Sequence, residues 1–117
     1  MDVVEKFRAK VEELNQLGSP GNVAAFLKEK GVRGVRRAPQ TCPIATYLQT
    51  ELFEPDDFSY RVVTGLFVVT LYPYRDPEPH LRTENVNREG GIRVDLSRGP
   101  RTFVQAFDNG LYPELER

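Results

Sequence analysis

Apolar residues near the start of the chain recur every three or four positions, which is the spacing of one face of an α-helix. A first helix is predicted after Asp2, which can cap it, and Gly18 is a suitable stop. Ser19-Pro20 then begins a second helix, which Gly31 ends. The turn between these helices is short, so we expect them to pack as an antiparallel helical hairpin. The apolar face of the first helix consists of Val3, Val4, Phe7, Val11 and Leu14.

The middle of the chain changes from helical spacing to strand-forming residues. Thr41 can cap a third helix, which Pro55-Asp56-Asp57 ends. The segments from Tyr60 to Val63 and from Leu66 to Tyr72 are rich in Val, Phe, Thr and Tyr, as strands are. Thr64-Gly65 between them is a plausible two-residue turn, and one bent strand is the alternative.

A long polar segment from Pro73 to Gly91 follows, and its length exceeds that of most ordered connections. We expect it to be either mobile or functional. Residues 92–96 alternate apolar and polar side chains, as a half-exposed strand does. Gly99-Pro100 opens a last helix, which Asp108-Asn109-Gly110 closes. The tail at 111–115 keeps three large apolar residues, so we expect it to dock on the core.

These segments together predict an α+β fold with the element order α-α-α-β-β-β-α. Strands that follow one another through short or polar loops, with helices segregated in sequence, favour a small three-stranded antiparallel sheet packed on helices. Such a sheet can leave its other face open to water. The length of 117 residues fits a single domain spanning residues 1–117.

Composition narrows the classes of function. The net charge of −1 argues against a whole-molecule electrostatic binder of nucleic acid, so any basic function has to be local. Cys42 is the only cysteine and His80 the only histidine, so we expect no intramolecular disulfide, no metal site and no cofactor. The longest apolar run, 66–69, is too short to span a bilayer, and the N-terminus lacks the apolar stretch of a signal peptide. We therefore expect a cytoplasmic protein without a membrane partner.

Two segments are similar to segments of a known group of proteins. Residues 41–48 read T-C-P-I-A-T-Y-L and resemble a CP(I/L)A-x-YL helix start. Residues 102–115 resemble an F-V-x-x-F-D-x-G-x-Y-P-E-L C-terminus. Both recur in a family of small uncharacterised proteins of high-GC Gram-positive bacteria and their phages, with a helical pair before them and a few strands between. The resemblance covers most of the chain, but it implies no activity, because none is known for that family. The segment 73–91 is longer than such proteins lead us to expect.

A basic stretch follows the second helix and holds five cations against one acid, Glu29. Gly31 and Gly34 would let the backbone approach a phosphate closely, and arginine forks suit phosphate oxygens. This stretch therefore carries the alternative hypothesis of a nucleic-acid-associated factor. The competing interpretation is a solvated loop whose cations suit a helix C-terminus. The five cations are Lys28, Lys30, Arg33, Arg36 and Arg37.

Cys42 is the one nucleophile to consider. A position near a helix start, with Arg36 and Arg37 close in sequence, lowers the pKa of a thiol. A nucleophilic cysteine also needs a base, and His80 lies far along the chain in the polar segment. A small buried apolar residue is the commoner fate of a free cysteine. We therefore favour the buried role for Cys42 and expect no enzymatic activity.

An acidic group at the end of the third helix could bind a cation or a basic partner, but it lacks the glycine-centred loop of an EF-hand. A solvated helix end is the interpretation we favour. Acids there oppose the helix dipole, which invites a partner, for example an arginine from residues 33–37. The four acids are Glu51, Glu54, Asp56 and Asp57.

The aromatic residues of the strand region lead to the main functional hypothesis. They could stack on bases, but the glycine–aromatic signature of RNA-binding sheets is missing, so core packing and protein contact are better interpretations. The leading hypothesis is a non-enzymatic interaction module or small regulator. Tyr72 and Tyr74 are its predicted partner-binding residues, and the partner is a second protein or another copy of the chain. The aromatic residues are Phe58, Tyr60, Phe67, Tyr72 and Tyr74.

Overall fold

The helices and strands follow one another in the predicted order α-α-α-β-β-β-α, which confirms the α+β fold class. The computed structural model describes residues 2–57, 59–73 and 91–117. Its elements are α1 (Val3–Asn15), α2 (Pro20–Glu29), α3 (Pro43–Leu52), β1 (Tyr60–Thr64), β2 (Val68–Pro73), β3 (Ile92–Asp95), α4 (Arg98–Asp108) and a 3₁₀ turn (Pro113–Leu115).

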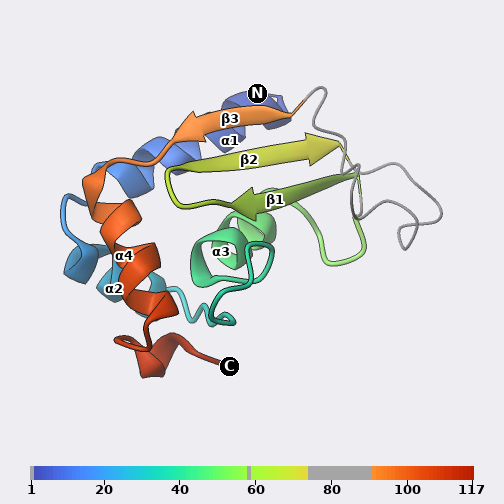
Figure 1. The fold of residues 1–117 in the computed structure, drawn as a ribbon. Coiled ribbons are helices and arrows are strands. Elements are labelled where there is room, and N and C mark those ends of the chain that lie inside the picture. The colour runs from blue at the N-terminus through green and yellow to red at the C-terminus, as the bar shows by residue number, and fades with distance from the viewer. Residues whose placement is uncertain (1, 58, 74–90) are drawn as a thin grey trace.

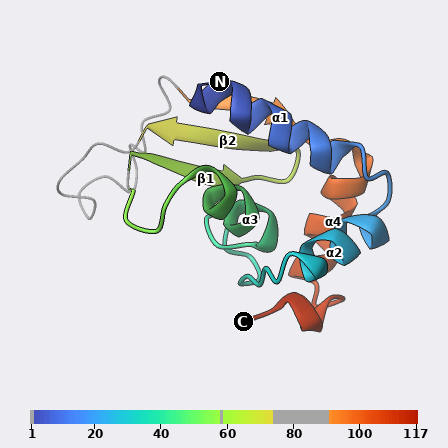
Figure 2. The same cartoon turned by 180° about the vertical axis from the view of Figure 1, so that it is seen from behind.

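The three strands form one antiparallel sheet in the order β1-β2-β3. Helices α1 and α3 cover one face of this sheet, which is the face seen in Figure 2. The opposite face is seen in Figure 1, and none of the described helices covers it. Helices α2 and α4 lie side by side beyond one end of the sheet in both views. The arrangement is therefore two-layered, with one sheet face left open.

The predicted hairpin of α1 and α2 is wrong, because α2 packs against α4 instead of along α1. Gly18, in the turn between the two helices, has a left-handed φ of +88°. Gly99 in the first turn of α4 lies against this turn so closely that a Cβ on it would be 2.9 Å from the Gly18 carbonyl. This contact between the two backbones packs the turn against α4. A pattern of apolar residues within one helix cannot show which other helix it will meet.

The core lies between the covered sheet face and the four helices, and it contains most of the predicted apolar positions. Phe7, Val11 and Leu14 of α1 are completely buried, as the spacing predicted. Tyr47, Phe103 and Phe107 are among the largest side chains that are less than 2% exposed. Complete burial of a large apolar side chain stabilises the fold by about 1.5–3 kcal/mol.

Several predicted boundaries shift by a residue or more. Cys42, and not Thr41, caps α3, because the Cys42 Sγ accepts the Ala45 N–H at 3.4 Å. The predicted two-residue turn is also wrong. Thr64 belongs to β1, and residues 65–67 join the two strands. A 2.8 Å hydrogen bond from the Gly65 N–H to the Val68 carbonyl closes this connection. Leu66 and Phe67 therefore lie at the tip of the hairpin and not in a strand.

The C-terminal tail docks only in part. Leu115 is buried, and Tyr112 packs on the core beside Phe103 with the ring centroids 5.2 Å apart. Leu111, however, is 68% exposed. The reason is the end of α4, where Gly110 has a left-handed φ of +81° and the Leu111 N–H bonds back to the Ala106 carbonyl, which turns the Leu111 side chain outward.

Candidate functional site

The open face of the sheet is set by the pairing register. Residues directly opposite each other in paired strands share a face. Tyr72 lies opposite Arg61, and Thr70 lies opposite both Val63 and Arg93. Because Val69 and Leu71 are completely buried toward the helices, their neighbours in β2 belong to the other face. We define the open face as Arg61, Val63, Val68, Thr70, Tyr72, Arg93 and Asp95, of which only Thr70 is buried.

The hairpin tip extends this face with the two most exposed apolar residues of the sheet region. The Leu66 side chain is 43% exposed and the Phe67 side chain is 58% exposed. The Arg101 guanidinium, from α4, lies 5.7 Å from the centroid of the Phe67 ring, within the range of a cation–π contact. An aromatic residue held by an arginine but left open to solvent is typical of the anchors found in protein interfaces.

The register places Tyr72, a predicted partner-binding residue, on the open face, and its ring also has a structural role. Its ring lies against Gly91, the first described residue after the long polar segment. A Cβ on Gly91 would be 3.0 Å from the Tyr72 Cε1 atom. Removing the ring would therefore disturb the sheet as well as any interface. Tyr74, most of the predicted long segment at 73–91, His80 and Phe58 lie outside the described residues.

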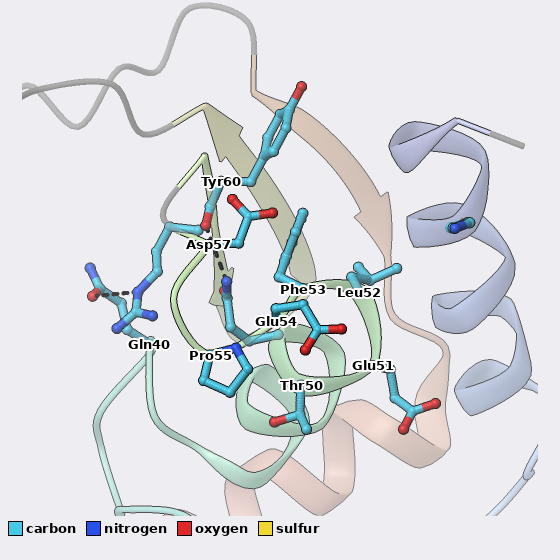
Figure 3. Close-up of a pocket in the computed structure, with 12 residues that line it drawn as sticks. Gln40, Thr50, Glu51, Leu52, Phe53, Glu54, Pro55, Asp57 and Tyr60 are labelled. Atoms are coloured by element: carbon cyan, nitrogen blue, oxygen red, sulfur yellow. Dashed lines mark hydrogen bonds between the residues drawn. The ribbon is translucent and has the colours of Figure 1, made fainter.

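A groove with a volume of about 790 Å³ runs between the C-terminal end of α3 and the start of β1 (Figure 3). Its aromatic wall is formed by Phe53 and Tyr60, whose rings stack at 5.6 Å with an interplanar angle of 15°. Figure 3 shows Asp57 beside these rings, Glu54 next to Phe53, and Glu51 farther away along the helix. The volume is in the range of small-molecule sites.

The polar side chains of this groove are largely engaged with the chain itself. Lys10 forms a 3.1 Å ion pair with Glu51, so the predicted pairing of the acidic group with an arginine from 33–37 is wrong for this residue. The Arg61 Nε donates to Gln40 at 3.3 Å. Hydrogen bonds from Ser59 lower the pKa of Asp57. The groove therefore has fewer free polar groups than its size suggests.

The basic stretch is spread over α2 and the loop after it, with all five cations exposed. The C-terminal tail pairs with this loop in parallel, since the Gly34 N–H donates to the Leu115 carbonyl at 2.8 Å. The pairing places Glu116 3.1 Å from the Arg36 Nε and brings Arg117 to the same surface. Arg117 and Glu116 therefore belong to the same surface as the basic stretch, although they lie far from it in the sequence.

Arg37 adopts a left-handed φ of +58°, which is uncommon for a residue other than glycine. Its N–H donates to the Asp108 Oδ1 at 2.8 Å, which holds the loop against α4. The acids Asp108 and Glu116 therefore reduce the local positive charge. This arrangement is closer to the solvated-loop interpretation than to a concentrated phosphate site.

Cys42 has the opposite character from a reactive thiol. It is only 4% exposed, and burial raises the pKa of its thiol. The Ala45 N–H lowers the pKa, but burial is the larger effect. The Thr64 hydroxyl oxygen is buried and has no hydrogen-bond partner in the described part of the chain. The sequence argument for a lowered thiol pKa is therefore wrong.

Comparison with known proteins gives no relative, because no family model, curated protein or solved structure matches the chain. The resemblance based on residues 41–48 and 102–115 stays an expectation. Within residues 2–57, 59–73 and 91–117, no group of three His, Cys, Asp or Glu side chains could hold a metal ion. No helix in that same part of the chain is long and apolar enough to cross a membrane.

Proposed function

We propose that the protein is a non-enzymatic interaction module that binds a protein partner through the hairpin tip and the open face of its sheet. The observation that carries this proposal is the exposure of Phe67 and Leu66 beside half-buried Val63, Val68 and Tyr72, on a face that no described helix covers. Exposed apolar side chains gathered at one place are typical of contact surfaces, whereas scattered ones are common everywhere.

The charges around this surface favour a partner of one kind. Arg101 contacts the Phe67 ring, and Arg93 is exposed on β3, against the single acid Asp95 on the same face. Arginine and aromatic residues are enriched at interfaces. We therefore infer a partner segment that carries apolar side chains next to carboxylates.

The test compares two exposed apolar residues by affinity capture from extracts of the source cell. Phe67→Ser removes the hairpin-tip ring, whereas Leu111→Ser changes a similarly exposed residue on the C-terminal tail. We expect the wild type and Leu111→Ser to retain the same protein and Phe67→Ser to lose it. Both variants should keep the wild-type melting temperature, because neither side chain is buried. Equal retention by Phe67→Ser would refute the proposed surface.

A nucleic-acid-associated factor is the second candidate function. The observation in its favour is that the five cations at 28–37 are all exposed and that Arg117 joins them. Binding would weaken with salt, because each neutralised phosphate releases counterions. A gel-shift titration at two salt concentrations should then show weaker binding by a variant with Arg33, Arg36 and Arg37 all replaced by Ala. Equal binding by this variant would exclude the segment.

A further inference from the structure

The two outer edges of the sheet differ in how their backbone groups are hydrogen-bonded. In each outer strand, alternate residues point their backbone N–H and C=O groups away from the sheet. These groups can pair with another strand. On β1, one backbone group of each outward-facing residue is bonded within the chain. The Gln49 side-chain amide donates to the Tyr60 carbonyl at 3.1 Å and accepts the Val62 N–H at 2.9 Å. The Thr64 N–H donates to the Pro39 carbonyl at 2.8 Å. The outer edge of β1 is therefore closed.

The pairing pattern shows which backbone groups of β3 point away from the sheet. The Leu96 N–H donates to the Phe67 carbonyl at 2.8 Å, so Leu96 and Phe67 form a hydrogen-bonded pair across the two strands. Bonded and non-bonded pairs alternate along an antiparallel ladder. Val94 therefore bonds to β2, and Arg93 and Asp95 direct their N–H and C=O groups outward.

This outer edge of β3 is only partly occupied. The Asn15 side chain donates to the Asp95 carbonyl at 2.9 Å, which agrees with the outward direction of that group. A carbonyl oxygen can accept a second hydrogen bond. The Arg93 N–H and carbonyl bond to none of the residues in the described ranges. Among the residues that the structure describes, the outer edge of β3 is therefore the one that can accept a strand.

We propose that β3 pairs antiparallel with β3 of a second copy of this chain, so that two three-stranded sheets become one sheet of six strands. The side chains of Arg93 and Asp95 lie two residues apart on the same face and are exposed. A symmetric pairing centred on Val94 places Arg93 opposite Asp95 of the second copy, and Asp95 opposite the second Arg93. The strand is thus complementary in charge to itself.

Charge also excludes the neighbouring registers. Centring the pair on Arg93 would oppose two arginines, and centring it on Asp95 would oppose two aspartates, and like charges directly opposite each other destabilise a sheet. A short, charged edge strand resists unspecific pairing, so these charges select a strand that matches them. The open faces of both copies would lie on the same side of the joined sheet. The inference does not depend on the proposed function, since it uses the edge and not the hairpin tip.

The test is sedimentation equilibrium of the whole chain over a wide range of concentration. The wild type should show a concentration-dependent dimer. Arg93→Asp and Asp95→Arg should each raise the dissociation constant of the dimer about tenfold or more, because each turns two attractive pairs into two repulsive ones. The double variant carrying both changes should recover the dimer, because it restores opposite charges at both pairs.

A matched control is Arg61→Asp, which reverses the same residue type on the closed edge and should leave the dimer unchanged. Hydrogen exchange of the wild type gives a readout without any substitution, since the Arg93 amide should exchange more slowly at high concentration than at low. A wild type that stays monomeric at all concentrations would overturn the proposal. Failure of the double variant to recover, while it remains folded, would overturn it too.

Discussion

Gln49 provides the sharpest test of how this small sheet is stabilised. Its side chain lies on α3 and forms two hydrogen bonds with β1, one to the Tyr60 carbonyl and one from the Val62 N–H. The amide takes the place that a fourth strand would occupy. Replacing it with alanine leaves both partly buried backbone groups without a partner. Each such bond contributes about 0.5–1.5 kcal/mol, so Gln49→Ala should lower the free energy of unfolding by about 1–3 kcal/mol.

Urea denaturation followed by circular dichroism measures this loss, and Gln16→Ala is the control. The Gln16 side chain makes one exposed bond to Glu12 at 3.3 Å, so its removal should change stability by less than about 0.5 kcal/mol. Gln49→Glu adds a chemical check. An ionised carboxylate can accept the Val62 N–H but cannot donate to the Tyr60 carbonyl, and protonation restores a donor. Its deficit relative to the wild type should therefore shrink at low pH.

Two outcomes would refute the reasoning about the closed edge. One is a Gln49→Ala variant that unfolds at the wild-type urea concentration. The other is a Gln49→Ala variant that loses stability but exposes no new edge, so that its tendency to associate equals that of the wild type. The first would show that water replaces the amide without cost, and the second that other groups cover β1.

Three further predictions concern buried or crowded positions. Gly34→Ala should cost more than about 2 kcal/mol in urea denaturation, because a Cβ there would be 2.5 Å from the Pro43 nitrogen; wild-type stability would contradict this. Tyr72→Ala should cost about 1–2 kcal/mol by uncovering Gly91, and a thermal melt unchanged from the wild type would show that the ring has no structural role. Burial raises the pKa of Cys42, so the unfolded thiol loses its proton first, and the free energy of unfolding should fall as the pH rises above 9.0. Cys42→Ala should flatten that slope, and a native thiol that reacts with a thiol reagent as fast as the unfolded one would contradict its burial.

The candidate site could be predicted only in part. Tyr72 belongs to a run of strand-forming residues, which placed it in the sheet, and its face follows once the register is known. Leu66 and Phe67 have the same composition as strand residues, so the sequence assigned them to β2. Their position at the hairpin tip depends on the bond from the Gly65 N–H to the Val68 carbonyl, which ends the ladder. Exposure at a turn cannot be derived from strand propensity alone.

The sequence by itself determined the local elements, because their signals are local. Apolar spacing, Asp2 and Ser19 as caps, and glycines after α2 and α4 act within a few residues of the chain. The tertiary structure decided what these elements meet: α2 packs on α4 through the contact of Gly99 with the turn before α2. It likewise decided the burial of Cys42 and the closing of β1 by a glutamine from α3. Such contacts join residues far apart in the chain, and a single sequence does not show which distant residues come into contact.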